Sequence, residues 1–419
     1  MQTGFTLEDV KVSREDKAIL RELAEKVKKL ASEPCMEEKR QLWKKHNMLQ
    51  KTRPLVFCDP ENGWNEIITR RQMRCKGRLA QRWEMDLRKE IFWGEDMGDD
   101  KPVEPYLDVP YTVSPDNWGV MLVYYQTDKL GSYTWDPPVK DYKTDLKKLH
   151  PPEFEIDWET TNGCLDLAED IFGDMLRVNL KGVWWWSLGI TSLAIYFRGI
   201  ENFFCDFIEH PEELKQLFSI ISQGYLQKLD FLEENNLLSL NNDGSYVGAG
   251  GFGFTQELPQ KDFNGHVRTV DMWGFAESQE TVNVSAKMYE EFVFPYEKII
   301  LERFGLNCYG CCEPLHSRWY VVKKHHNLRR VSCSPWVDIE KMVSYLENKY
   351  IFSMKPHPAI LAKPFIDEEY IRKQIRKAFE VTRECRVEII MKDNHTIGKN
   401  PKNVVKWCQI AREEAERYS

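Results

Sequence analysis

Apolar residues recur along this chain with two spacings, one that fits helices and one that fits short buried strands. The first example is a helix predicted over residues 14–31, with Ser13 as its N-cap and Asp16 in its first turn. One face of this helix is apolar and is formed by Ile19, Leu20, Leu23, Val27 and Leu30. Its other face is charged. The helix could therefore cover the rest of the chain or a partner subunit with its apolar face, and the second arrangement would make a homodimer.

From about residue 52 onward, short apolar runs alternate with helical segments. The strands that we expect are residues 55–58, 103–113, 182–187, 237–240, 271–276, 305–310, 328–332, 350–354 and 387–391. The helices that we expect are residues 76–93, 159–178, 211–236, 286–303, 338–347, 367–383 and 401–418. Repeated strand–helix units favour a parallel sheet, and a count of about eight or nine strands favours a closed (β/α)8 TIM barrel over a doubly wound sheet.

These elements define the expected domain organisation. Residues 1–50 form an N-terminal helical extension, and residues 51–419 form the barrel. A stretch of about residues 114–156 is rich in Pro, Asp and Lys, and we expect it to be an insertion over one mouth of the barrel.

Composition narrows the function classes. The chain has 419 residues, of which 42% are hydrophobic, and its net charge is −8 without any block of like charge, so a nucleic-acid partner is not expected. No apolar run reaches the roughly 18 residues of a membrane span. Residues 1–13 are polar and lack the core of a signal peptide. The eleven cysteines are therefore interpreted as reduced thiols of a cytoplasmic protein.

The richest chemistry lies directly after one predicted strand. Residues 306–316 hold three cysteines, a glutamate and a histidine, and active residues of a barrel lie at the carboxyl ends of its strands. Thiolates beside a carboxylate are typical of a catalytic zinc site, which needs three protein ligands and one open position. The candidate ligands are Cys311 or Cys312, Glu313 and, from the end of the last strand, His395.

Each candidate ligand also has a structural interpretation. Adjacent cysteines of an extended chain point to opposite faces, so only one of Cys311 and Cys312 would bind metal unless the chain turns between them. Both could instead be small buried hydrophobic residues. His395 follows Asp393 and could be a ligand, a general acid or a turn residue. Cys308, inside the strand, is expected to pack.

A glycine-rich stretch, residues 242–270, and the residues that flank it supply candidates for substrate binding. Asn241 and Asp243 could hydrogen-bond a substrate or simply form a turn. Phe254 and Trp273 could stack on an aromatic substrate or pack in the core. Because the glycines match no phosphate-binding pattern, we expect a mobile flap here.

Several segments carry a family resemblance together. They include Tyr309-Gly-Cys-Cys-Glu-Pro314 and Lys392-Asp-Asn-His-Thr-Ile-Gly398, along with residues 285–295, 331–336, 199–203 and 210–214. In order and spacing they resemble the uroporphyrinogen decarboxylase superfamily, and more closely its corrinoid-dependent methyltransferases and O-demethylase-type proteins. The chain departs from the zinc methyltransferases of that family. It has no histidine two residues before Cys311 or Cys312, and it has His395 where they carry a cysteine ligand.

The resemblance implies a methyltransferase that takes a methyl group from a small-molecule donor, for example a methoxylated aromatic compound. The acceptor would be the cobalt of a corrinoid (methylcobalamin) bound to a partner corrinoid protein, with zinc activating the leaving heteroatom. His395, Asp393 and Glu313 would be the catalytic residues. The alternatives are a decarboxylase-like enzyme that works without metal and a non-catalytic barrel that binds a corrinoid or tetrapyrrole.

Overall fold

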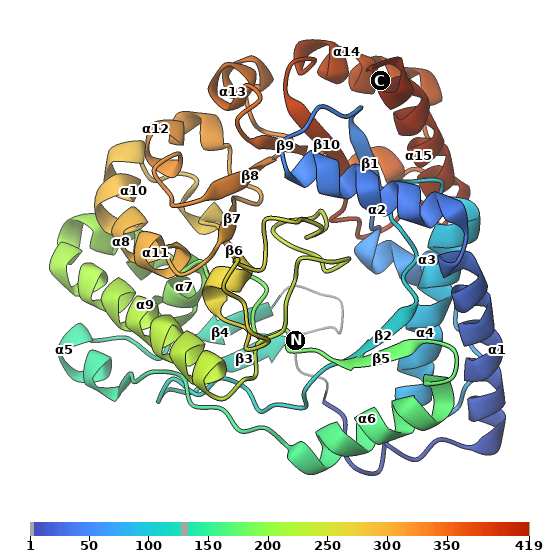
Figure 1. Ribbon diagram of the computed structural model, residues 1–419. Coiled ribbons are helices and arrows are strands. Elements are labelled where there is room, and N and C mark those ends of the chain that lie inside the picture. The colour runs from blue at the N-terminus through green and yellow to red at the C-terminus, as the bar shows by residue number, and fades with distance from the viewer. Residues whose placement is uncertain (1–3, 127–132, 419) are drawn as a thin grey trace.

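The main element of the fold is a six-stranded parallel sheet. The computed structural model describes residues 4–126 and 133–418. Its strands lie in the order β1, β10, β9, β8, β7 and β6. Their bounds are Leu55–Cys58, Arg386–Met391, Ile351–Met354, Leu328–Cys333, Leu306–Tyr309 and Trp273–Ala276. A second parallel pair, β2 (Tyr106–Val109) and β5 (Arg177–Leu180), lies across from this sheet (Figure 1).

Helices surround the strands on the outside (Figure 1). They include α4 (Arg78–Phe92), α6 (Trp158–Phe172), α7 (Thr191–Arg198), α8 (Ile200–Glu209), α9 (Pro211–Glu234), α10 (Ala286–Phe292), α11 (Phe294–Leu301), α12 (Trp319–Val322), α13 (Ile339–Leu346), α14 (Glu368–Val381) and α15 (Lys402–Ala415). Parallel strands with helices outside make an α/β fold of the TIM-barrel type, which confirms that part of the prediction. The helix expected over residues 286–303 is divided at Val293, because Pro295 lies in the first turn of the second helix.

Both edges of the six-stranded sheet are completed by side chains. At β1, the Asp100 carboxylate accepts the N–H of Val56 at 2.8 Å, and the Asp99 carboxylate accepts that of Cys58 at 3.0 Å. At β6, Asn241 accepts the N–H of Trp273 at 2.9 Å and donates to its carbonyl at 3.0 Å. Residues 182–187 and 237–240, expected as strands, therefore lie outside the ladder that the described residues form.

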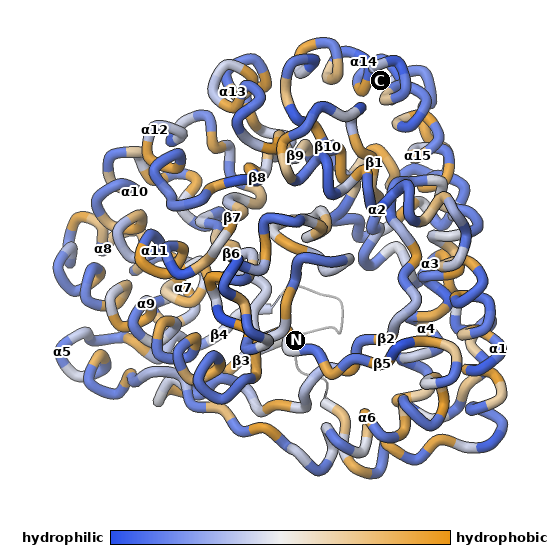
Figure 2. The backbone as a smooth tube through the Cα atoms, in the orientation of Figure 1, coloured by the Kyte–Doolittle hydropathy of each residue, from blue (hydrophilic) through white to orange (hydrophobic). Residues whose placement is uncertain are grey.

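The N-terminal helix covers its own chain. Helix α1 (Arg14–Ala31) packs on α4 and α6, and Ser13 caps it by accepting the N–H of Asp16 at 3.0 Å. Figure 2 shows hydrophobic and hydrophilic residues alternating along this helix, and Leu20, Leu23, Val27 and Leu30 of its apolar face are buried. The covering role, one of the two that the sequence allowed, is the one observed.

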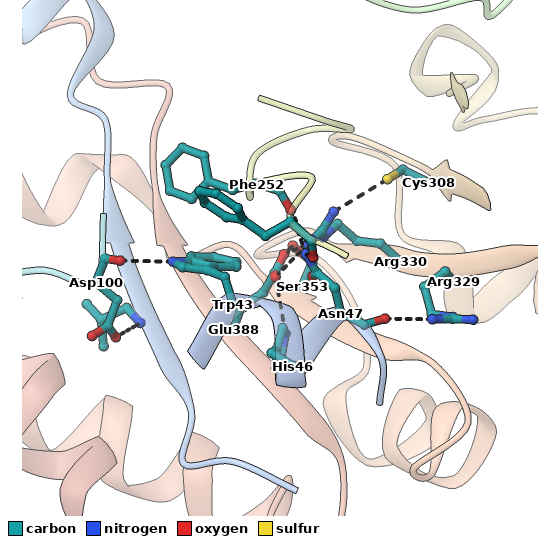
Figure 3. A network of polar contacts seen from close by, with 12 residues as sticks. Trp43, His46, Asn47, Asp100, Phe252, Cys308, Arg329, Arg330, Ser353 and Glu388 are labelled. Carbon is teal, nitrogen blue, oxygen red and sulfur yellow. Dashed lines mark hydrogen bonds and ion pairs between the residues drawn. The ribbon is translucent and has the colours of Figure 1, made fainter. Parts of the chain in front are cut away.

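A buried polar network lies inside the ring of strands (Figure 3). Arg330 of β8 donates to Glu388 of β10 at 2.9 Å and to the side chain of Asn47 at 2.7 Å. Asn47 is the last residue of helix α2 (Pro34–Asn47). This end of the helix lies near the amino ends of the strands, since the carbonyl of Leu49 accepts a hydrogen bond from Arg386 at the start of β10. Burial favours the neutral form of Glu388, but Arg330, His46 and Lys355 together outweigh it and lower the pKa of Glu388 to about 2.

The glycine-rich segment enters this interior and is not a flap. Residues 247–255 are buried, and Figure 1 shows the chain after α9 running into the middle of the ring. A Cβ atom on Gly248 would lie 2.8 Å from the Cβ of Cys308. The φ of Gly248, +69°, also favours glycine. The sequence predicts mobility for this segment, whereas in the structure its glycines permit close approach of one backbone to its neighbours.

None of the helices in the described residues is long and apolar enough to cross a membrane.

Candidate active site at the carboxyl ends of the strands

A turn after β7 brings two thiols together. Gly310 has a φ of +90°, and the chain turns there so that the sulfurs of Cys311 and Cys312 lie 3.7 Å apart. Cys311 is buried and Cys312 is exposed. The backbone also bends at Cys311 and Cys312, which is the exception that the sequence left open for adjacent cysteines.

The carboxylate of Glu313 holds this turn in place. Glu313 is 1% exposed, and one of its oxygens accepts the N–H of Cys311 at 2.9 Å. Its other oxygen accepts the N–H of Ser278, after β6, at 3.0 Å. Glu313 thus joins the loops that follow two neighbouring strands.

The two thiols differ in acidity. A hydrogen bond with Cys311 lowers the pKa of Cys312, and the ammonium group of Lys392 acts in the same direction against burial and Asp393. The same hydrogen bond, together with burial, raises the pKa of Cys311. Cys312 is therefore the thiol that ionises first, and a thiolate is the nucleophilic and metal-binding form of cysteine.

The loop after β10 contributes charge to the same end of the ring. Lys392 lies 2.9 Å from a carboxylate oxygen of Asp393 and 3.4 Å from one of Glu61. Burial lowers the pKa of Lys392, but these carboxylates outweigh burial and raise it. Asp393 has a φ of +60°. His395 follows two residues later and is exposed.

Two further carboxyl groups lie at the end of β6, where the sequence places polar residues without assigning these two a role. Glu277 is buried, and burial and the charges of Glu280 and Glu313 raise its pKa well above the ordinary value. Burial also raises the pKa of Glu280, which is partly exposed and accepts a hydrogen bond from Thr191 at 2.7 Å. Their position directly after a strand was the available signal.

An aromatic cavity adjoins these carboxyl groups. It has a volume of about 130 Å³, and its lining includes Trp184, Trp185, Tyr225 and Ser187. The hydroxyl of Ser187 lies 3.4 Å from a carboxylate oxygen of Glu277. The wall also includes Asp116, from the predicted insertion. Another cavity, of about 110 Å³, lies at the opposite end of β10.

Lys355 lies at the carboxyl end of β9, among the polar residues that the sequence places at strand ends. It is buried, and its ammonium group donates to the hydroxyl of Ser353 at 2.6 Å. Burial lowers the pKa of Lys355 to about 8, although Glu388 acts in the opposite direction.

The predicted substrate-binding residues lie elsewhere in the ring. Asn241 pairs with the backbone of Trp273, and Asp243 accepts hydrogen bonds from Lys181 at 2.9 Å and from the N–H of Ser245 at 2.8 Å. Trp273 and Phe254 are 2% and 5% exposed, so both pack in the interior. Contact with a substrate stays a prediction for these four residues.

The four predicted zinc ligands do not fit a zinc ion in this arrangement. Both oxygens of Glu313 accept backbone N–H groups, and Cys311 is paired with Cys312. In the described ranges, no three His, Cys, Asp or Glu side chains are grouped as a metal site. Zinc binding by Cys311, Cys312, Glu313 and His395 stays a prediction.

Comparison with known proteins supports the fold. No family model matches the chain, and no curated protein matches it. Among solved structures, a methyltransferase from Methanosarcina mazei superimposes with a TM-score of 0.53 at 10% sequence identity. The superposition covers 91% of this chain and 98% of that chain. At this identity the likeness shows that the two share a fold.

Proposed function

We propose that this protein is a methyltransferase of the corrinoid-dependent type. It would take a methyl group from oxygen or nitrogen of a small aromatic donor and pass it to the cobalt of a corrinoid held by a separate partner protein. Two facts support the reaction class: the fold is shared with a methyltransferase, and polar groups gather where TIM-barrel enzymes place their active sites.

The observation that carries the proposal is the aromatic cavity, whose Ser187 contacts Glu277. Its volume of about 130 Å³ is close to the roughly 150 Å³ of a protein cavity that binds benzene, so a single aromatic ring is the matching substrate size. Trp184, Trp185 and Tyr225 offer ring faces and edges for stacking. Ser187 connects the cavity to the carboxyl group of Glu277.

Methyl transfer from a heteroatom needs a group that neutralises the departing oxygen or nitrogen. The corrinoid supplies the nucleophile for the methyl group, and the protein must supply the proton. Glu277 and Glu280 have raised pKa values, so their carboxyl groups hold protons at a higher pH than ordinary glutamates. Glu280, the more exposed of the two, is the proposed proton donor, and burial, together with the negative charge of Glu313, favours its protonated form.

The proposal is tested with purified protein, cob(I)alamin and a panel of methoxybenzoates and methylated amines. Formation of methylcobalamin is followed by its absorbance, and carbon dioxide is measured in the same samples. Absence of methyl transfer with every donor, in the presence and absence of added zinc, would contradict the proposal. Release of carbon dioxide alone would support the decarboxylase-like alternative.

Zinc is assessed separately by measuring metal content. One zinc per chain in the wild type, lost in His395→Ala, would support the predicted ligand set and require its donors to rearrange. Retention of the metal in His395→Ala would exclude His395 from the set.

A further inference from the structure

We propose that Cys311 and Cys312 form a redox modification site, in which a peroxide joins the two thiols in a disulfide between adjacent residues. The effect of this bond on methyl transfer rests on the proposed function, but the modification itself does not. The inference is based on the geometry of the turn after β7 and on the unequal exposure of the two sulfurs.

The geometry is unusual for adjacent residues. In an extended chain their side chains diverge, whereas here the sulfurs lie 3.7 Å apart. Gly310 permits the turn, and a Cβ atom at this position would lie 2.6 Å from a methyl group of Leu315. Glu313 fixes the other side by accepting the N–H of Cys311. The contact between the thiols is therefore built into the turn.

The exposure of the two sulfurs gives them different roles. Cys312 is exposed and can meet a peroxide, whereas Cys311 is 7% exposed and lies behind it. Cys35 and Cys205 are also exposed, but no second thiol is recorded beside either of them in the described ranges. Cys58 and Cys408 do contact each other, but both are 0% exposed. Among the cysteines, all of which lie in the described ranges, the pair at 311–312 combines contact with access.

The chemistry proceeds in two balanced steps. The thiolate of Cys312 attacks one oxygen of hydrogen peroxide, the O–O bond breaks, and a sulfenic acid and hydroxide form. The thiol of Cys311 then attacks the sulfur of that sulfenic acid, forms the S–S bond and releases water. Two thiols are oxidised by two electrons in total, and one peroxide is reduced to two waters.

The disulfide should be easy to reduce. Consecutive Cα atoms are about 3.8 Å apart, below the usual range of about 4.4–6.8 Å for disulfides, so the bond is strained. Strained, exposed disulfides are the labile ones. The strain would act on the peptide next to the N–H that Glu313 accepts, and Glu313 borders Glu277. Methyl transfer should therefore fall on oxidation and return on reduction.

The modification is tested by mass spectrometry of the full-length protein. Reduced protein is exposed to hydrogen peroxide, unfolded, alkylated with N-ethylmaleimide and digested with trypsin. The informative peptide is residues 304–318, which carries Cys308, Cys311 and Cys312. We expect it to lose two hydrogens and to be alkylated on Cys308 alone, and dithiothreitol should restore alkylation of all three cysteines.

Matched variants separate the two thiols. Cys312→Ser should abolish the loss of hydrogens, whereas Cys311→Ser should leave a sulfenic acid on Cys312 that dimedone traps. Cys35 and Cys205 report single exposed thiols in the same digest, and Cys58 with Cys408 report a sealed pair. Alkylation of all three cysteines in the 304–318 peptide, at a peroxide dose that oxidises Cys35, would overturn the proposal.

Activity measured on the same samples separates this proposal from the proposed function. A disulfide in a protein whose reduced form transfers no methyl group would leave the modification site standing and contradict the function. A disulfide that leaves methyl transfer unchanged would overturn the regulatory effect.

Discussion

Glu280 is the single residue whose chemistry is most open to test. Its carboxyl group is partly exposed, adjoins Glu277 and has a pKa raised first by burial. A proton donor must hold its proton, so the rate of methyl transfer should fall as the pH rises through this raised pKa. The pKa of the Cys312 thiol shifts in the opposite direction, because its hydrogen bond with Cys311 lowers it.

Glu280→Gln should lower kcat for methyl transfer by roughly 100-fold or more, because the amide cannot donate the proton of a carboxylic acid. The fall in rate at high pH should disappear with it. The rate is measured from methylcobalamin formation across pH. Glu209→Gln, at an exposed glutamate, is the control and should behave like the wild type. An unchanged kcat and pH profile in Glu280→Gln would assign the proton to another group.

Two of the shorter segments of the chain owe their conformation to a single side chain or its absence. Asn241 takes the place of a strand beside β6, and Gly248 lets the buried segment approach β7. Neither role follows from hydrophobic periodicity, which describes the faces of an element and not the group that completes its edge.

Asn241→Ala should lower the free energy of unfolding by about 1–3 kcal/mol, because the N–H and carbonyl of Trp273 lose their partners. Unfolding in urea measures this change. Asn264→Ala, at an exposed asparagine, is the control and should cost less. If Asn241 bound substrate, as the sequence suggested, KM would rise while stability stayed the same.

Gly248→Ala should destabilise the fold by about 1–3 kcal/mol more than Gly265→Ala. Both glycines have positive φ, +69° and +102°, so both substitutions strain the backbone. A Cβ atom on Gly248 would meet Cys308 at 2.8 Å, whereas nothing lies within 4 Å of one on Gly265. The difference in urea midpoints isolates the contact. Equal midpoints would mean that the interior yields to the extra methyl group.

The alternation of strands and helices could be predicted because each strand of the sheet is a short apolar run between longer amphipathic helices. The candidate site was predicted in part. The polar residues after β7 and β10 do lie at the carboxyl ends of their strands, but the sequence could not show that Glu313 is bonded to two backbone amides. Glu277 and Glu280 stand out through their mutual charge and burial, which depend on the distance between segments and not on spacing along the chain.

Across the whole molecule, buried ionisable groups make stability depend on pH. Burial raises the pKa of Glu297 from 4.5 to about 8 and that of Asp99 from 3.8 to about 7. A carboxyl group with a raised folded-state pKa stabilises the fold fully below its unfolded pKa and loses that effect as pH rises through the folded value. The pKa of Glu388 is lowered in the folded state, so its effect on stability has the opposite sign. The stability that Glu388 contributes is lost as pH falls from 4.5 through about 2.

Glu297→Gln should therefore flatten the loss of stability between about pH 5 and pH 8, because the amide does not titrate. A slope from Asp99 should remain in this variant. Urea unfolding at several pH values measures the effect, with Glu302→Gln, at an exposed glutamate, as the control. A slope identical to that of the wild type would mean that Glu297 ionises normally in the folded protein.

Because side chains complete the edges of the sheet, backbone hydrogen bonds at the edges should open more readily than those in its middle. Strands β8 and β9 are held by backbone ladders on both sides, whereas the amides of Val56 and Trp273 depend on the rotamers of Asp100 and Asn241. Rotation of one side chain frees such an amide without unfolding a strand. Among the amides of the sheet, hydrogen exchange should therefore be fastest at the β1 and β6 edges. These edges can open locally while the hydrogen bonds between strands remain intact.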